Sequence, residues 1–184
     1  MNQWVISDNH FRHARIWGFT DFQGKRIRPE FDNPRDGDAY MIEMWNQTVK
    51  PEDHLWHGGD FCMGNDQHWL DIGPRLNGHK RLIPGNHDKL QHAYNFRAAG
   101  FEKVCGAKEI QVAGLRLLFT HYPVHDSCLF KRDGNVHGHT HQNEPPSLRH
   151  FNVSVERLGY KPMHIEDLAK IVKERLELYR ETHP

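Results

Sequence analysis

Near its C-terminal third the chain reads His137-Gly138-His139-Thr140-His141, a run of alternating histidines interrupted by a glycine. On an extended segment, side chains two positions apart point to the same side, so His139 and His141 can direct two imidazoles into one small volume. Gly138 has no side chain, which lets the backbone pass close to a bound group. An H-x-H pair alone is a weak metal motif. The H-x-H pair indicates a metal site only if other parts of the chain supply further ligands.

The length and composition of the chain limit what it can be. Its 184 residues suit a single domain spanning 1–184, which can bury a substantial core. The 24 basic and 24 acidic residues cancel, so any nucleic-acid contact would be local rather than driven by a global field. Three widely spaced cysteines argue against a disulfide framework. The amino terminus lacks a long apolar run, so we expect a cytoplasmic protein without a membrane segment.

Several short apolar runs end abruptly in polar residues. The run from Gln3 to Ser7, for example, predicts a buried strand and is followed at once by Asp8-Asn9-His10. Strands that end in polar residues and alternate with helices are typical of α/β folds with a site at the carboxyl ends of the strands. The predicted strands are 3–7, 54–57, 80–83, 102–104, 108–112, 115–120, 135–137 and 148–153, with Ala113-Gly114 as a hairpin turn.

In the segments between these strands, apolar residues recur at the spacing of a helix. Apolar residues at Met41, Ile42, Trp45 and Val49 recur with the period of a helix. The predicted helices are 39–49, 67–76, 90–99 and 165–179. The segment 18–38 is rich in Gly, Pro, Asp and Arg without a clear period, so it predicts a long irregular loop of functional importance.

Five of the polar segments share residue types and follow a fixed order. They are Asp8-x-His10, Gly59-Asp60, Gly85-Asn86-His87-Asp88, His121 and Gly138-His139-x-His141. In order and type they resemble the five motifs of the calcineurin-like metallophosphoesterase superfamily. The downstream stretches Asn152-Val153-Ser154-Val155 and Tyr160-Lys161-Pro162 resemble its small, cap-less bacterial and phage members. The resemblance implies an α/β fold, a four-layer sandwich of two mixed β-sheets flanked by helices.

The resemblance also implies a dinuclear metal site. A carboxylate has two oxygens and can span two cations, whereas an imidazole serves one, so Asp60 suits the bridging position. Asn86 offers a neutral oxygen ligand. A nitrogen and oxygen set without thiolate favours two divalent transition-metal ions among Mn, Fe, Ni, Co and Zn. The implied ligands are Asp8, His10 and His141 for one metal, Asn86, His121 and His139 for the other, and Asp60 for both.

The implied activity is that of a metal-dependent phosphoester hydrolase, with a hydroxide bridging the metals as the nucleophile. Asp60 and His87 are the expected catalytic residues. His87 follows Asn86 but is not a ligand, and its protonated imidazole could donate to the leaving-group oxygen, the role that the family gives this position. Asp88 would either orient His87 or cap the following helix, and the cap is our preferred interpretation.

The sequence narrows the substrate only in part. The G-D-x-x-D-R pattern of the protein phosphatases is absent after Asp60, and His87 is present without a dedicated arginine for monoesters. We therefore expect a phosphodiesterase acting on small or single-stranded phosphoesters, such as nucleotides. Three alternatives stay open: a phosphomonoesterase or nucleotidase of the same mechanism, a nuclease, and a non-catalytic metal-binding scaffold. The run Lys25-Arg26-Ile27-Arg28 gives the nuclease its only support, and such a run is more often solvated.

Further residues are candidates for supporting roles. Arg12, His13 and Arg81 could contact the substrate. His57 and His137 are expected to pack behind the ligands as their hydrogen-bonding or packing partners. Cys62 is expected to be buried beside the site without a catalytic role. Substrate selection would fall to loop 18–38.

Overall fold

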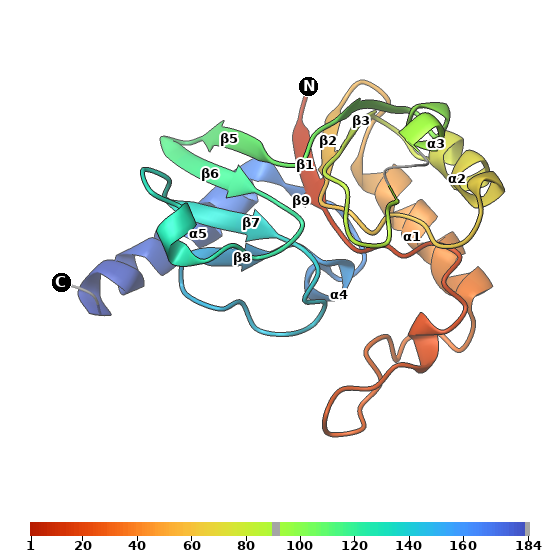
Figure 1. Ribbon diagram of the computed structural model, residues 1–184, viewed down its shortest axis with the longest axis horizontal. Coiled ribbons are helices and arrows are strands. Elements are labelled where there is room, and N and C mark those ends of the chain that lie inside the picture. Colours follow the sequence, from red (N-terminus) through yellow and green to blue (C-terminus); the bar gives the residue numbers. More distant parts are fainter. Residues whose placement is uncertain (90–92, 183–184) are drawn as a thin grey trace.

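The computed structural model describes residues 1–89 and 93–182 and contains two mixed β-sheets (Figure 1). The first sheet has the order β4 (Phe101–Val104), β3 (His79–Leu82), β2 (His54–His57), β1 (Gln3–Ile6), β9 (Met163–His164). Strands β1 to β4 are parallel, and β9 pairs antiparallel with β1. The parallel pairing brings the carboxyl ends of β1, β2 and β3 to the same edge of the sheet.

The second sheet has the order β5 (Lys108–Val112), β6 (Leu115–Phe119), β7 (Gly134–His137), β8 (His150–Asn152). β5 and β6 form an antiparallel hairpin through the predicted turn, where Ala113 and Gly114 both have positive φ. β6, β7 and β8 are parallel. The two sheets meet at their carboxyl ends, because Ser7 N donates to Val153 O at 2.9 Å and Val155 N donates to Ser7 O at 3.0 Å.

Two hydrophobic clusters hold the layers together. Helices α1 (Pro34–Thr48), α2 (Asp66–Ile72) and α3 (Ala93–Ala98) contribute to the first, in which Trp45 of α1 packs with Leu55 of β2. The second joins Val5 of β1 with Phe119 of β6 and Val172 of α5 (Ile165–Thr182). The first sheet therefore has helices on one face and the second sheet with α5 on the other. This confirms the predicted α/β sandwich of two mixed sheets flanked by helices.

The helix boundaries differ from the predicted ones for local reasons. α1 begins well before the predicted 39–49, because the Asn33 side chain accepts from Asp36 N and Pro34 occupies the first helical position. α2 ends early and continues as the 3-10 helix η2 (Gly73–Arg75), which contains a proline. α3 lies within the predicted helix 90–99, of which residues 90–92 are outside the described part of the chain.

The structure also contains four short elements that the sequence did not predict. These are the 3-10 helices η1 (Ile16–Gly18) and η4 (Asp126–Cys128), the helix α4 (Val155–Leu158) and the strand β9. α4 follows the segment that joins the two sheets, so its first residues lie close to the carboxyl end of β1.

Segment 18–38 is more ordered than the predicted irregular loop. A bridge between Thr20 and Arg26 forms a small hairpin, which we call the 19–27 hairpin. Its turn is fixed by the Asp21 side chain, which accepts from the backbone N–H groups of Gln23 and Lys25, both at 2.9 Å. The hairpin projects from the body of the molecule below the carboxyl ends of the first sheet (Figure 1).

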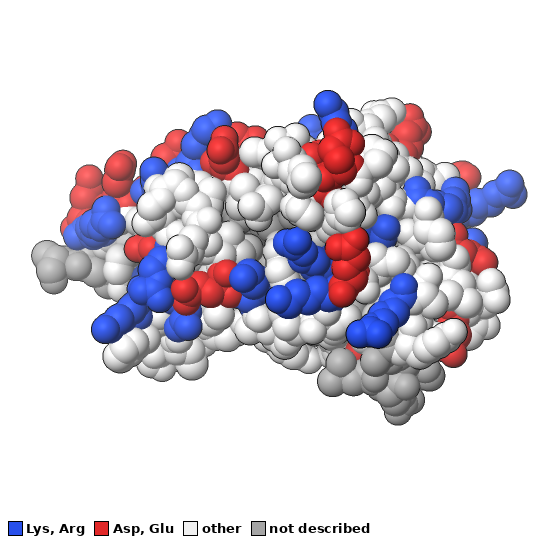
Figure 2. All heavy atoms as spheres, turned by 90° about the horizontal axis from the view of Figure 1, so that it is seen from above, with Lys and Arg blue, Asp and Glu red and all other residues white. Residues whose placement is uncertain are grey.

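Charged side chains of both signs are interspersed over the face seen from above, which is the side opposite the 19–27 hairpin (Figure 2). This matches the equal numbers of acidic and basic residues in the sequence. Among residues 1–89 and 93–182, no helix has the length and apolar character needed to cross a bilayer.

Candidate metal centre

The polar segments predicted from the sequence meet where the two sheets join. Asp8 follows β1, Asp60 follows β2 and His121 follows β6, while β7 leads into the H-x-H pair. Each of two groups of three side chains has ligand atoms within 4.8 Å of one another. The first group is Asp8, His10 and His141, and the second is Asp60, His121 and His139. Six of the seven implied ligands therefore come together in the two predicted sets, and Asn86 contacts the second.

The backbone around these groups is strained. Non-glycine residues with positive φ include Asp8 (60°), His10 (50°), Asp60 (54°), His139 (67°) and His141 (49°). Such left-handed conformations are unfavourable for residues with a Cβ and tend to cluster at functional sites. Five of the seven implied ligands share this feature, so the chain holds them in position at a cost in conformational energy.

Gly138 is required by the close approach of two backbone segments. A Cβ at this position would overlap Ser7 Oγ and Asp8 Oδ2. The neighbouring N–H of His139 donates to both oxygens of the Asp8 carboxylate, at 3.1 and 2.9 Å. The missing side chain therefore lets the H-x-H segment hold the Asp8 carboxylate in place.

In the first group, His10 has the environment of a metal ligand. The side chain is 3% exposed, and neither ring nitrogen has a hydrogen-bond partner among the described residues. Burial lowers its pKa to about 2, so the ring is neutral and keeps a lone pair. Burial also raises the pKa of the Asp8 carboxylate. A buried imidazole without a partner beside buried carboxylates fits a bound cation, which would satisfy both.

His141 is oriented by residues that the sequence reading missed. Its Nδ1 lies 3.0 Å from Glu156 Oε1, and Glu156 is buried at the start of α4. Arg28, from the segment after the 19–27 hairpin, donates from Nε to the same oxygen at 2.8 Å. Although burial opposes ionisation, Arg28 and His141 lower the pKa of Glu156 to about 2. A ligand histidine usually has such a partner, and Glu156 directly follows the quoted stretch Asn152-Val153-Ser154-Val155.

The second group is held by backbone and amide oxygens. His121 Nδ1 lies 2.8 Å from Gly58 O, and because a carbonyl only accepts, this nitrogen carries a proton and Nε2 faces the group. Asn86 Oδ1 lies 2.9 Å from His121 Nε2 and 3.0 Å from His139 Nδ1. Burial alone would lower the pKa of His121. Hydrogen bonding to Asp60 and the charge of Asp8 outweigh this effect and raise the pKa. Carboxylates that stabilise a protonated imidazole at this position would also stabilise a metal cation bound there.

Asp60 lies between the two groups. Its Oδ2 is 3.5 Å from His10 Nε2 and 3.4 Å from His121 Nε2. Its Oδ1 accepts the backbone N–H of His87 at 2.8 Å. One oxygen therefore faces both groups, while the other fixes the backbone at His87.

His87 is exposed at the edge of the site, with its ring centroid 5.3 Å from that of His10. Within the described residues the Asp88 carboxylate accepts three backbone N–H groups, from Gly85 at 2.9 Å, Asp60 at 2.6 Å and Phe61 at 3.0 Å, and none of them belongs to His87. The helix start that Asp88 was expected to cap falls on residues 90–92, outside the described part of the chain. Asp88 thus ties the segment after β3 to the segment after β2.

Among the predicted substrate contacts, His13 lies near the site and Arg81 does not. The His13 ring centroid is 5.6 Å from that of His10. Arg12 lies two residues after His10 and is exposed, and its backbone N–H donates to Asp38 Oδ2 at 2.9 Å. Arg81 reaches back along the strands, with Nη2 3.3 Å from His54 Nδ1 at the amino end of β2. The structure therefore directs Arg81 away from the metal groups.

The expected supporting residues take different positions. His57 is buried, with Nε2 2.8 Å from Asn9 Oδ1, so it connects the segments after β1 and β2. His137 is buried and contacts the carbonyl of Gly138 at 2.8 Å rather than a ligand side chain. The run 25–28 is not simply solvated as expected, because Arg28 is fully buried.

A cavity of about 320 Å³ opens beside the second group. Asn86 and His87 form one side of it, and the buried Cys62 lies on another. Cys62 is buried as expected, and its burial raises the pKa of the thiol. The cavity provides space for an organic group next to His87.

The fold and site thus define an α/β sandwich with two adjacent Asp/His groups. No family model matches the chain. An uncharacterized protein of Methanocaldococcus jannaschii is 27% identical over 179 residues, covering 92% of this chain and 90% of that protein. The gene 66 protein of Mycobacterium phage L5 is 30% identical over 174 residues, covering 76% of this chain and 77% of that protein. The chain belongs to the family of this phage protein.

A solved structure gives the same picture of the fold. The crystal structure of a protein of unknown function from Aquifex aeolicus superposes with a TM-score of 0.73 at 29% sequence identity. The match covers 92% of this chain and 98% of that one. The architecture described above is therefore shared over nearly the whole of both chains.

Proposed function

We propose that this protein is a dinuclear metal-dependent phosphoester hydrolase that acts on phosphodiesters. The observation that carries the proposal is the position of Asp60 Oδ2, 3.5 Å from His10 of one group and 3.4 Å from His121 of the other. A carboxylate shared by two sets of nitrogen and oxygen ligands suits two divalent cations rather than one.

The residues divide between the two cations as the groups do. Asp8, His10 and His141 would hold one, and Asn86, His121 and His139 the other, with Asp60 between them. The donor set favours Mn, Fe, Ni, Co or Zn. When bound, such a pair supplies water acidified enough to attack phosphorus and positive charge that stabilises the transition state.

His87 would deliver the proton that the leaving group needs. Its backbone is fixed by Asp60, and its exposed ring adjoins both His10 and the cavity. An imidazole in this position can hold a proton and transfer it to the oxygen of the departing group as the P–O bond breaks. The organic part of that group would then lie in the cavity.

Arg28 and Arg81 are unavailable to a substrate phosphate, which favours a diester over a monoester. A monoester dianion is usually held by an arginine that binds two of its oxygens. The buried Arg28 is engaged with Glu156 and with the carbonyls of Asp8 and Asn9, and Arg81 points away. A diester has a single negative charge and therefore needs fewer positive side chains around it than a monoester dianion does.

The test is hydrolysis of bis(p-nitrophenyl) phosphate and p-nitrophenyl phosphate by protein reconstituted with each candidate metal. We expect faster turnover of the diester, with Asp60→Asn as the inactive blank. His87→Ala should lower kcat on the diester by about 10²–10⁴-fold. His125→Ala, at an exposed histidine that contacts Ser127 instead, is the matched control and should be unchanged.

Other outcomes identify the alternatives. Turnover of the monoester alone would indicate a phosphomonoesterase or nucleotidase of the same mechanism. A scaffold should bind fewer than two metal ions per chain by elemental analysis, and His87→Ala should then change nothing.

A further inference from the structure

Building on the proposed function, we propose that the substrate is an internucleotide phosphodiester of a single nucleic-acid strand. The strand would stack its bases on Tyr122 at one side of the metal groups and on the 19–27 hairpin at the other. The surface consists of Tyr122, Phe19 and Phe22, three exposed aromatic residues in segments held by hydrogen bonds.

Tyr122 borders the second group. Its ring centroid lies 4.5 Å from that of His139 and 5.0 Å from that of His121, yet the residue is 50% exposed. The backbone is fixed because Thr120 Oγ1 donates to Tyr122 O at 2.6 Å, and Asn135 Nδ2 donates to Thr120 Oγ1 at 2.9 Å. Tyr122 is therefore a pre-positioned ring that is open to solvent beside the proposed reaction centre.

Phe19 is connected to the first group through His13. Its ring lies 5.6 Å from that of His13, which in turn lies 5.6 Å from that of His10. Phe19 is 45% exposed. Its backbone is fixed at both ends, since its N–H donates to Ile16 O at 3.2 Å and its carbonyl accepts from Ile27 N at 2.9 Å. One half-exposed ring thus lies against the second group, and another lies one histidine away from the first group.

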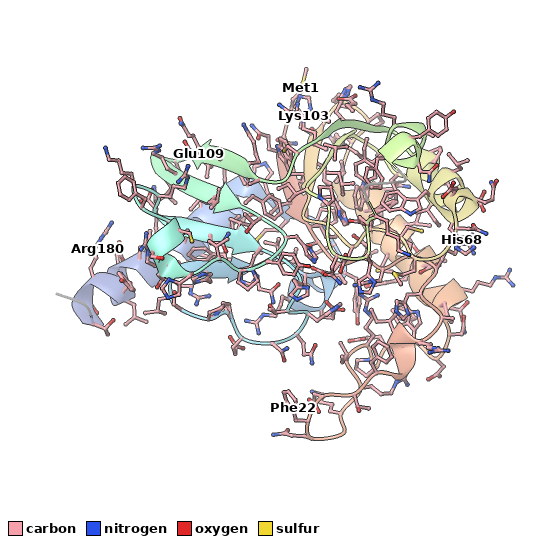
Figure 3. All side chains as sticks on the ribbon, viewed as in Figure 1. Met1, Phe22, His68, Lys103, Glu109 and Arg180 are labelled. Carbon is pink, nitrogen blue, oxygen red and sulfur yellow. The ribbon has the colours of Figure 1, made fainter. Side chains whose placement is uncertain are left out.

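The hairpin continues this surface away from the site. Phe22 at its tip is fully exposed and points away from the body of the molecule (Figure 3). Exposure of a phenylalanine on a loose loop would mean little, but here the turn is fixed by Asp21, and Gly24 supplies a positive φ of 78°. An aromatic ring that this turn presents fully to solvent contributes no packing to the fold. Such a ring suits a partner with planar groups on which it can stack.

Stacked bases are the ligand that fits such rings. Proteins that bind single strands combine aromatic side chains with nearby cations, and stacking is independent of net charge. Arg15 and Lys25 are exposed beside Phe19 and on the hairpin, and no ion pair of either is found within residues 1–89 and 93–182. In a duplex the bases are stacked on one another and unavailable, so the geometry favours a single strand. A small diester would use only the two rings next to the metals.

The experiment measures kcat/KM on a thymidine dinucleotide, a thymidine octanucleotide and bis(p-nitrophenyl) phosphate. The variants are Tyr122→Leu, Tyr122→Phe, Phe19→Leu and Phe22→Ala. Phe22→Ala should lower the octanucleotide-to-dinucleotide ratio of kcat/KM about tenfold, the effect of one stacked base. Tyr122→Leu and Phe19→Leu should lower kcat/KM on both oligonucleotides, and Tyr122→Phe, which keeps the ring, should restore it. Phe130→Ala removes an exposed phenylalanine elsewhere and should change nothing.

A second measurement separates binding from turnover. Anisotropy of a fluorescein-labelled octanucleotide, measured in the metal-loaded His87→Ala background, should show about tenfold weaker binding when Phe22→Ala is added. The proposal is overturned if the aromatic variants match Phe130→Ala in both measurements, or if a duplex is cleaved as fast as the single strand. Failure of every variant and the wild type to hydrolyse any diester would instead refute the proposed function, while the binding measurement would still decide the stacking surface.

Discussion

The guanidinium of Arg28 donates to the carboxylate of Glu156 at 2.8 Å across 128 residues of sequence, with both side chains buried. The same carboxylate oxygen lies 3.0 Å from Nδ1 of His141. Arg28 also donates to the carbonyls of Asp8 and Asn9, at 2.7 and 2.9 Å. This ion pair therefore fastens the long segment 18–38 to the first metal group and orients one of its histidines.

Arg28→Met should destabilise the protein strongly. The substitution leaves the Glu156 carboxylate buried without its cation, and breaking a buried pair in this way costs about 3–5 kcal/mol. The measurement is urea unfolding of the metal-free protein. Lys170→Met removes a pair of the same length, 2.8 Å to Asp167, that is exposed on α5, and should lower the free energy of unfolding far less. Equal losses for the two variants would contradict the role given to Arg28.

Glu156→Gln should weaken metal binding while keeping the size of the side chain. The carboxylate fixes the ring of His141 and increases its basicity, and loss of such a partner typically lowers metal affinity by about 10–100-fold. Calorimetric titration with Mn²⁺ or Zn²⁺ measures the effect directly. Glu144→Gln is the control, because Glu144 pairs with Arg157 at the surface and should leave the affinity unchanged. An unaltered affinity in Glu156→Gln would show that His141 needs no such partner.

Gly138→Ala should disturb the site although it adds one methyl group. The new Cβ would overlap Ser7 Oγ and Asp8 Oδ2, so one of the two segments must shift. We expect a loss of about 1–3 kcal/mol in the free energy of unfolding and weaker binding of the metal held by Asp8. Gly106→Ala makes no contact within 4 Å and should have little effect. Thermal unfolding with and without metal compares the two variants, and identical curves would disprove the steric argument.

The set of implied ligands comes from the resemblance of five short motifs to a known family, and the strand pattern explains why these residues come together. Each lies within four residues of the end of a strand, and the parallel pairing of strands brings those ends to one edge of a sheet. Asp60 is an example, because the apolar run 54–57 and the glycines after it place the carboxylate at the sheet edge. The hairpin turn at Ala113 and Gly114 was predictable for the same reason.

Residues whose role depends on distant partners could not be predicted. Arg28 lies in a segment without a period, and only the position of Glu156 in the folded chain makes it a buried residue. Arg81 was expected near the substrate, but its strand register with Trp56 directs the guanidinium over that ring and toward His54. Two of the three N–H groups that donate to the Asp88 carboxylate, those of Asp60 and Phe61, belong to another strand end, which no local pattern reveals.

A fourth prediction concerns acid stability and involves a carboxylate away from the metal groups. Although burial opposes it, hydrogen bonds from Asn2 N, Trp4 Nε1 and Lys50 N lower the pKa of Asp53 to about 2, below its ordinary value of 3.8. Because the unfolded chain then binds the proton more tightly, this contribution to stability is complete above about pH 4 and is lost as the pH falls toward 2. Asp53→Asn should be less stable than the wild type at pH 7, and the gap should narrow between pH 4 and pH 2. Urea unfolding at a series of pH values measures this difference, and a gap that stays constant across that range would show that Asp53 has no lowered pKa.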